Sequence, residues 1–282
     1  MTKMSPRDIL SFGATPLLVQ ITRAKVLPRV TALSPLKRFL EIGAGTCHVS
    51  FMVKSSNKSL LVIATDVSRS ALSAAKKLEG VFRTRLDAMI CCDCSHLPFK
   101  DETFEMVSGT AVLHHLGNPG DACAEACRVL KLHGEYLGIE GVVPPFLRTF
   151  VRFMTAANYR ETQEGIREGI LDYQTWVNVF ARAGGMRVVI EPLIAPESYA
   201  QLINYKPVPD SYRPHYRIRY PYELLLGHLP INISSAILKK FLPGTVTITA
   251  TKIKPSNPTV SFPSRNGRFN NELTFIARIE DR

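Results

Sequence analysis

The chain has 282 residues, of which 45% are hydrophobic and 21% are charged, and these values are ordinary for a globular protein. No stretch approaches the roughly 18 consecutive apolar residues of a membrane span, and the N-terminus lacks the apolar region of a secretory signal. We therefore expect a soluble, cytoplasmic protein with one large α/β domain or two small ones.

The charge of the chain is strongly basic. Its formal net charge is +11 at pH 7, and the excess is greater in the C-terminal half. Such an excess suits an anionic substrate, a nucleic acid or a membrane surface. It is equally compatible with an ordinary solvated surface, so charge alone does not identify a partner.

The first periodic segment is 14–32, whose apolar residues recur at roughly helical spacing, with Pro28 expected to end or kink the helix. An apolar strand follows at 39–42. It runs into a tight turn that contains Gly43 and Gly45, and then into a helix. Two glycines one residue apart let the backbone approach a ligand closely, and the start of a helix offers unpaired N–H groups.

A second apolar strand covers 60–65 and ends in Asp66. An acid about 20 residues beyond the glycines, at the tip of the second strand, accepts hydrogen bonds from the hydroxyls of a ribose. The order strand, loop, helix, strand therefore predicts a nucleotide-type cofactor site. A dinucleotide site has a third glycine three positions after the second, where this chain has His48, and this disfavours an NAD-type dehydrogenase.

Three further segments continue the alternation of strands and helices: 87–99, 104–116 and 124–137. The first is a strand that runs into a Leu-Pro-Phe turn, and the second is a strand followed by Leu-His-His. The third belongs to a helix that we expect to begin at Pro119 and to run through Leu132, before a fifth strand over 135–140.

These patterns, in this order and at this spacing, resemble class I S-adenosylmethionine (SAM) methyltransferases of the type 11 group over about 38–142. Cys47 stands where the family usually has a third small residue, and Leu132 and His133 replace a Pro and a Gly of the family. The resemblance implies an α/β fold, with a Rossmann-like, seven-stranded, mostly parallel sheet, helices on both faces, and an insertion between strands six and seven.

The resemblance also implies SAM as the cofactor. Glu41 would orient the methionine end, Asp66 would bind the ribose, and Asp93 would contact the adenine. The complete set of cofactor-binding residues that we predict is Glu41, Gly43, Ala44, Gly45, Asp66, Val67, Asp93, Cys94 and Gly109. No metal site is predicted, because the six cysteines lack the spacing of zinc ligands and are better explained as small buried hydrophobes.

Methyl transfer from a sulfonium requires mainly that two reactants be positioned, often with a base for the proton of the acceptor. His114 and His115 follow the fourth strand, where the family's methyl group points, so one of them is a candidate catalytic base. The alternative is a structural role at the rim of the cofactor site. The sequence leaves both interpretations open.

Beyond residue 142 the sequence changes character. The apolar residues of 146–154 are spaced as in a core, lid or membrane-surface helix. A helix over 172–183 and a strand over 186–191 resemble the family's last helix and sixth strand, and 245–251 alternates as a seventh strand. We thus expect one methyltransferase domain over 1–254, followed by a linker and tail over 255–282.

The insertion 195–243 is rich in Tyr and Arg, which suit stacking on rings and binding of anions. We expect it to cover the site, although packing of the insertion against the sheet would explain the same residues. The acceptor contacts that we predict include Tyr212, Arg213, Tyr216 and Arg217.

Methyl transfer to a small-molecule, lipid-linked or sugar-linked acceptor is the function that the sequence favours. An Asn/Asp-Pro-Pro-aromatic motif, typical of amine and adenine N-methyltransferases, is absent after the fourth strand, where the chain reads Gly-Thr-Ala-Val. RNA or protein remains an alternative acceptor. The other alternative is a SAM-fold protein without turnover that acts as a regulatory or scaffold partner. Peripheral membrane contact also stays open, as does the oligomeric state.

Overall fold

The computed structural model describes residues 22–33, 37–142, 173–192 and 244–255. Four sequence predictions lie wholly or partly outside the described residues: the first part, 14–21, of the helical segment 14–32, the helix at 146–154, the insertion 195–243 and all but the first residue of the tail 255–282. Among the described residues, no helix combines the length and apolar character needed to cross a bilayer.

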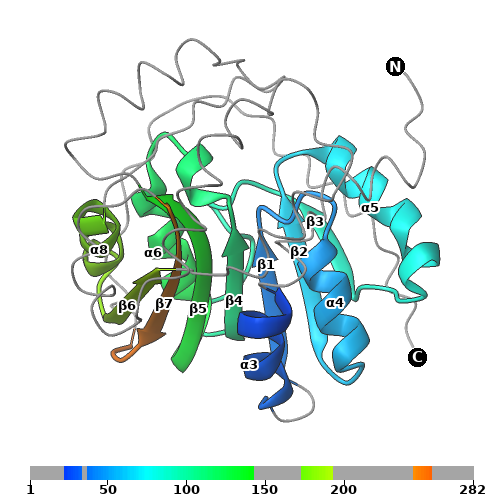
Figure 1. The fold of residues 1–282 in the computed structure, drawn as a ribbon, viewed down its shortest axis with the longest axis horizontal. Helices are drawn as coiled ribbons and strands as arrows, with labels where there is room; N and C mark the ends of the chain where they lie inside the picture. Colours follow the sequence, from blue (N-terminus) through cyan, green and yellow to red (C-terminus); the bar gives the residue numbers. More distant parts are fainter. Residues whose placement is uncertain (1–21, 34–36, 143–172, 193–243, 256–282) are drawn as a thin grey trace, which may run out of the picture.

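The described residues form one sheet of seven strands in the order β3-β2-β1-β4-β5-β7-β6 (Figure 1). Strand β7 pairs antiparallel with β5 and β6, and the other neighbours pair parallel. The predicted fold class, a Rossmann-like and mostly parallel seven-stranded sheet, is confirmed. The strands are β1 (Arg38–Ile42), β2 (Leu61–Asp66), β3 (Ala88–Cys91), β4 (Phe104–Thr110), β5 (Leu130–Val142), β6 (Met186–Pro192) and β7 (Gly244–Lys252).

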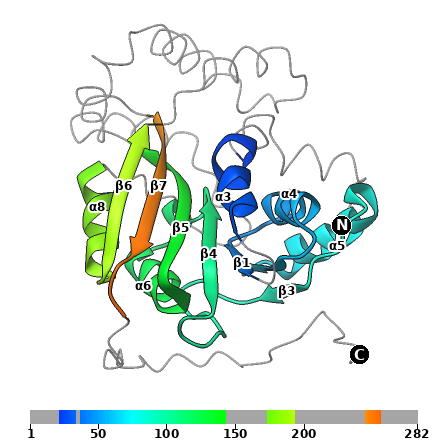
Figure 2. The same ribbon diagram turned by 90° about the horizontal axis from the view of Figure 1, so that it is seen from below.

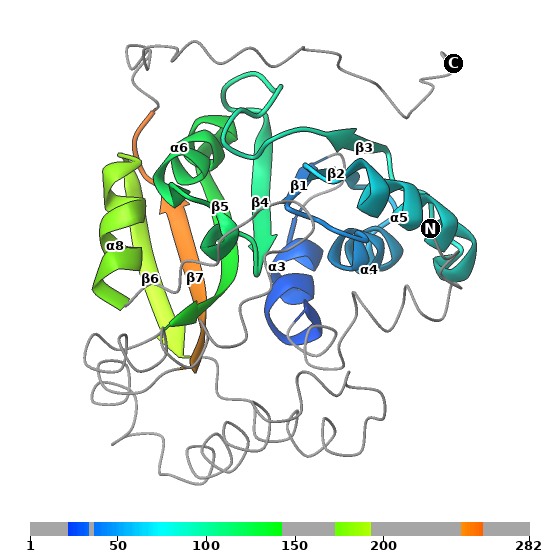
Figure 3. The same ribbon diagram turned by 90° about the horizontal axis from the view of Figure 1, so that it is seen from above.

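Helices cover both faces of the sheet. Figures 2 and 3 show α6 and α8 on one side and α3 and α4 on the other, with α5 beside α4 at the β3 edge. Short helical turns precede α3 and follow β4. The helical elements are η1 (Thr22–Val26), α3 (Leu27–Thr31), α4 (His48–Ser56), α5 (Arg69–Phe82), η2 (Leu113–His115), α6 (Pro119–Val129) and α8 (Tyr173–Arg182).

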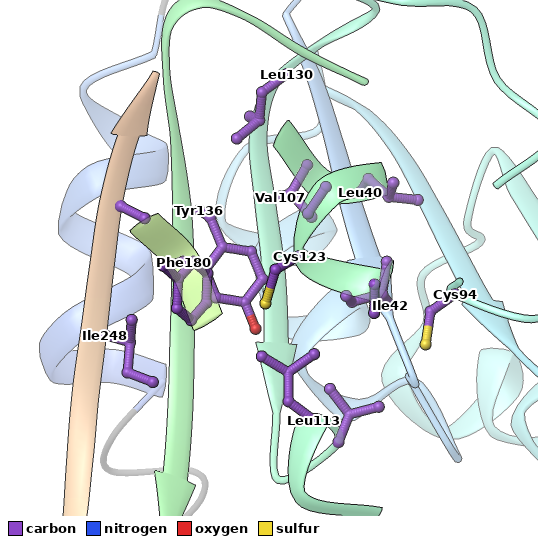
Figure 4. Packing of buried hydrophobic residues seen from close by; sticks show 14 of the residues in the cluster. Leu40, Ile42, Cys94, Val107, Leu113, Cys123, Leu130, Tyr136, Phe180 and Ile248 are labelled. Carbon is purple, nitrogen blue, oxygen red and sulfur yellow. The ribbon is translucent and has the colours of Figure 1, made fainter. Parts of the chain in front are cut away.

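Two hydrophobic clusters hold the layers together, one on each face of the sheet. Tyr136 of β5 lies in the first cluster with its ring centroid 5.1 Å from that of Phe180 in α8, and Figure 4 shows the two rings together with Cys123 of α6. Phe51 of α4 and Phe39 of β1 belong to the second. The central strands are apolar on both faces because both faces are covered, as in most parallel sheets.

The predicted end of one helix is wrong. Helix α6 ends at Val129, and the helix predicted through Leu132 gives way to β5 at Leu130, because Leu130 pairs with Phe104 of β4. A change of register between Phe104 and Met106 then accommodates the following residues, and His133 has φ 65°, a left-handed value that fits the family's glycine there. Tertiary pairing therefore overrides the apolar spacing that favoured a longer helix.

Of the two outcomes predicted for Pro28, an end or a kink of the helix, the structure does not show an end at this residue. Pro28 occupies the first turn of α3, which begins at Leu27 and continues to Thr31. A missing N–H is tolerated there because the first N–H groups of a helix have no partner within the helix. The π-helical turn η1 precedes it, so Pro28 starts a new α-helical segment.

Candidate active site

The turn between β1 and α4 has three left-handed residues, at φ 58° for Gly43, 51° for Gly45 and 60° for Cys47. A Cβ on Gly43 would lie 2.0 Å from Cγ2 of Val112, so the turn is packed against the segment after β4. A Cβ on Gly45 would meet no atom of the described residues within 4 Å. The turn is therefore closed by packing at Gly43 and open at Gly45.

Asp66, at the end of β2, fastens this turn to the sheet. Its Oδ2 accepts a hydrogen bond of 2.7 Å from the Gly45 N–H, and its Oδ1 accepts one of 2.7 Å from the Ser68 N–H. The Ala44 N–H donates to the carbonyl of Thr65 over 2.9 Å. The two features that the sequence analysis combined, the glycine turn and the acid, are thus in direct contact.

Glu41 is buried behind the turn, with 3% of its surface exposed. Its Oε2 accepts hydrogen bonds from the backbone N–H of Ser50, over 2.8 Å, and from the Ser50 hydroxyl. Because the N-cap residue Cys47 offers no side-chain cap, Glu41 supplies the acceptor for the first turn of α4. Burial raises the pKa of Glu41 to about 7, and the nearby charge of Asp66 adds to the effect.

The turn after β3 lies beside Asp66, because Cys91 is the register partner of Asp66 and the Cys92 N–H donates to the Asp66 carbonyl over 3.1 Å. Asp93 is exposed, and its Oδ1 accepts a 2.8 Å bond from the Ser95 N–H. Val67 is 59% exposed. An exposed apolar side chain next to two acids suits a ligand with a ring and hydroxyl groups.

Arg128 at the end of α6 holds the Leu-Pro-Phe turn in place. Its guanidinium donates to the carbonyls of Phe99, over 2.7 Å, and Leu97, over 3.0 Å. The Leu97 N–H donates in turn to Glu125, which also pairs with Arg128. Two segments that the sequence singled out separately are thus one structural unit, which no sequence pattern revealed.

His114 lies in η2 after β4, and its Nδ1 is 2.6 Å from Oε2 of Glu140 in β5. The His115 ring is adjacent, with its centroid 4.1 Å from that of His114. The sequence analysis missed Glu140. A signal was available, because the carboxyl ends of neighbouring parallel strands meet at one edge of a sheet.

Gly109 and Cys94, both predicted to contact the cofactor, border the core. A Cβ on Gly109 would lie 2.7 Å from the Tyr136 hydroxyl and 2.9 Å from Cγ1 of Val112. Cys94 is 7% exposed and belongs to the hydrophobic cluster around Tyr136. The roles of both in cofactor binding stay predictions, as do those of the other candidate residues.

Residues 40–137 match the family model described as a methyltransferase domain. Over these residues the chain has a domain of the class I SAM-dependent methyltransferase family. The YcgJ protein of Bacillus subtilis has a similar fold, with a TM-score of 0.56 at 15% identity, over 83% of this chain and 99% of that one. Geranyl diphosphate C-methyltransferase from Streptomyces coelicolor, in complex with Mg²⁺, geranyl diphosphate and S-adenosylhomocysteine, has a similar fold, with a TM-score of 0.59 at 13% identity, over 89% of this chain and 86% of that one.

Curated relatives of the chain are named as methyltransferases. A demethylmenaquinone methyltransferase of Renibacterium salmoninarum is 31% identical over 153 residues, which are 53% of this chain and 60% of that protein. A ubiquinone/menaquinone biosynthesis C-methyltransferase of Desulfotalea psychrophila is 29% identical over 40% of this chain and 48% of that protein. The chain spans about half the length of the curated relatives that it matches.

The residues of this site fit SAM, the cofactor of the matched domain family. A Cβ on Gly45 would enter space that no described residue fills, and Val67 and Asp93, which are exposed, lie close to Asp66 along the carboxyl edge of the sheet. When bound, SAM would supply an activated methyl group on a sulfonium. In the predicted roles, Glu41 would face its cationic end, and Asp66 and Asp93 would offer acceptors for ribose and adenine.

Asp66→Ala is expected to weaken SAM binding by about 2–3 kcal/mol, because charge-assisted hydrogen bonds to the ribose are lost and the Gly45 N–H loses its acceptor. Calorimetric titration with SAM measures the effect. Asp87→Ala is a matched control, since Asp87 accepts from the Val62 N–H over 2.7 Å but precedes β3 at the opposite edge of the sheet. Unchanged affinity in a folded Asp66→Ala protein would remove Asp66 from the cofactor site.

Proposed function

We propose that the protein transfers the methyl group of SAM to a small-molecule or lipid-linked acceptor. The observation that carries the proposal is the contact between the glycine turn and the acid of the second strand. Asp66 holds the Gly45 N–H at 2.7 Å, and the turn stays open on the side of Gly45. This arrangement presents a carboxylate and an accessible backbone to one ligand at the carboxyl edge of the sheet.

The names of relatives, the basic charge of the chain and its Tyr- and Arg-rich insertion favour a small, apolar or anionic acceptor. Relatives of the chain are named for quinone precursors, and a protein of similar fold is named for geranyl diphosphate, which are apolar or anionic small molecules. The basic excess of the chain suits an anionic group on the acceptor. We further propose that 195–243, outside the described residues, supplies acceptor contacts through its Tyr and Arg side chains.

The alternative function is that of a SAM-fold protein that does not transfer methyl groups and acts as a regulatory or scaffold partner. It is based on Cys47, which stands at a position where the family has a small residue. The Cys47 side chain is fully buried and packs in the cluster formed with α4 and α5, and its Sγ lies 3.8 Å from the Gly45 carbonyl. Because the thiol points into the core, it does not fill the open side of the turn. This favours a functional cofactor site.

Two measurements test the proposal. Calorimetry is expected to show binding of SAM and S-adenosylhomocysteine and no binding of NAD; tight binding of NAD alone would overturn the cofactor assignment. Transfer of labelled methyl groups is then measured with a panel of quinols, prenyl diphosphates, phenols and lipids, with RNA and protein as comparison. Binding without transfer to any acceptor class would favour the regulatory alternative.

A further inference from the structure

Glu140 lies near the carboxyl end of β5 and is almost completely buried, with 1% of its surface exposed. Three nitrogen atoms converge on its carboxyl group. Oε1 accepts from the backbone N–H groups of Val112, over 3.2 Å, and Leu113, over 2.9 Å. Oε2 is 2.6 Å from Nδ1 of His114. Both oxygens of this buried carboxyl group therefore have hydrogen-bond partners.

Two ionisable side chains near Glu140, Tyr136 of β5 and Cys123 of α6, stay protonated and neutral. Burial and the Glu140 charge together raise the pKa of Tyr136 well above its usual value. The pKa of the Cys123 thiol is raised well above its usual value for the same two reasons. Both groups are therefore neutral, and His114 is the ionisable side chain that pairs with Glu140 in the described part of the chain.

A carboxylate only accepts hydrogen bonds, so its bond with His114 places a proton on Nδ1 of the imidazole. The other nitrogen, Nε2, is then an acceptor in the neutral ring. We propose that Glu140 is a positioning residue that fixes this tautomer, so that His114 takes the proton of the acceptor. The proposal rests on the proposed methyl transfer, and it narrows the acceptor to one that loses a proton from oxygen, nitrogen or an acidic carbon.

The same carboxyl group connects His114 to the cofactor turn. Val112, whose N–H donates to Glu140, is the residue whose side chain closes the turn at Gly43. His114 and Val112 thus lie on one short segment after β4, which is bonded to Glu140 of β5 and packs against the glycine turn. Fixed geometry of this kind lowers the entropic cost of bringing reactants together.

The proposed step balances in protons and electrons. The acceptor forms a bond to the methyl carbon as the carbon–sulfur bond breaks and leaves its electron pair on sulfur. The proton of the acceptor passes to Nε2 of His114. The resulting imidazolium is stabilised by the Glu140 carboxylate until the proton leaves to water, in the manner of an oriented histidine base.

The variant Glu140→Gln distinguishes the proposed role of Glu140, fixing the tautomer of His114, from a purely structural role as a hydrogen-bond acceptor for the backbone. The amide oxygen still accepts from Val112 and Leu113, so the fold is expected to persist. The amide N–H₂ group now faces Nδ1 of His114 as a donor, which favours the tautomer with the proton on Nε2. Glu140→Asp, which keeps a carboxylate, is the conservative variant, and Glu135→Gln is a matched control on the same strand.

The experiment is nitrogen-15 NMR of histidine-labelled protein with S-adenosylhomocysteine added, with the His114 signals identified by their absence in His114→Gln. We expect a protonated Nδ1 and an unprotonated Nε2 in the wild type, the reverse in Glu140→Gln, and the wild-type pattern in Glu140→Asp and Glu135→Gln. With an acceptor from the panel, Glu140→Gln should lower kcat by about 10²- to 10⁴-fold, the usual contribution of general base catalysis.

The wild-type spectrum alone can overturn the proposal. A proton on Nε2, or protons on both nitrogens throughout the neutral pH range, would mean that His114 is not prepared to accept a proton. Unchanged tautomer and kcat in Glu140→Gln would also exclude the positioning role. Calorimetry with S-adenosylhomocysteine on the same samples keeps the two proposals apart, because loss of cofactor binding in the wild type refutes the proposed function instead.

Discussion

Gly43→Ala is expected to lower the free energy of unfolding by about 3–4 kcal/mol. Its Cβ would lie 2.0 Å from Cγ2 of Val112, and φ is 58°, where a side chain is strained. Overpacking costs roughly 1–3 kcal/mol and the left-handed conformation about 1–2 kcal/mol. Val112 cannot easily retreat, because its N–H is bonded to buried Glu140. Urea unfolding of the variant measures the loss.

Gly45→Ala is the matched control, since Gly45 has a similar φ of 51° but no atom within 4 Å of a Cβ. Its expected loss of stability is only the conformational cost of about 1–2 kcal/mol. The same methyl group enters the open side of the turn, so SAM affinity should fall about ten- to a hundredfold. Equal stability losses in both variants would show that the contact with Val112 does not close the turn.

Glu41→Gln is expected to stabilise the protein at pH 8 by about 3 kcal/mol, because a difference of one pKa unit corresponds to about 1.4 kcal/mol. Glu41 has a pKa of about 7 in the folded protein against an ordinary value of 4.5, so the folded state holds its proton more tightly. Its contribution to stability is complete below pH 4.5 and is lost as the pH rises through 7. The amide keeps an acceptor for Ser50 and never ionises.

The lowered pKa of His48 has the opposite effect on how stability changes with pH. Burial lowers its pKa from 6.5 to about 4, so its contribution is complete above pH 6.5 and is lost as the pH falls through 4. Between pH 4.5 and 6.5 the slopes from Glu41 and His48 oppose each other and leave a nearly flat profile.

Free energies of unfolding measured between pH 4.5 and 7 test the pKa shifts of Glu41 and His48. Glu41→Gln should make stability rise with pH up to 6.5, and His48→Gln should make it fall from 4.5 to 7. A Glu41→Gln profile parallel to that of the wild type would show that Glu41 is not perturbed. If Glu41 also contacts the cationic end of SAM, wild-type affinity should rise as the pH passes 7, and the affinity of Glu41→Gln should not.

Much of the fold followed from local patterns. The glycine turn, Asp66 and the strands around them were predicted because strand periodicity, turn residues and the spacing of an acid are all written within a short stretch of chain. The resemblance to the methyltransferase family over 38–142 was sufficient to predict the sheet, which the structure confirms.

Other features depend on contacts between distant residues. Glu41 was predicted to face the cofactor, but whether its carboxyl group also caps α4 depends on how helix and strand pack, and the structure shows that it bonds Ser50. The position of Glu140 at the carboxyl end of a strand was visible in the sequence, but its partner was not, because only the packing of β4 against β5 brings His114 to within 2.6 Å of it.

The end of α6 was likewise decided by tertiary structure. Leu130 and Leu132 suit a helix by spacing, but pairing of Leu130 with Phe104 draws the chain into the sheet. The sequence by itself therefore determined the type of fold and the cofactor turn, since these depend on local periodicity and on short-range spacing. Tertiary structure alone determined that Glu140 pairs with His114, because the contact between β5 and the segment after β4 depends on register and burial that no single segment encodes.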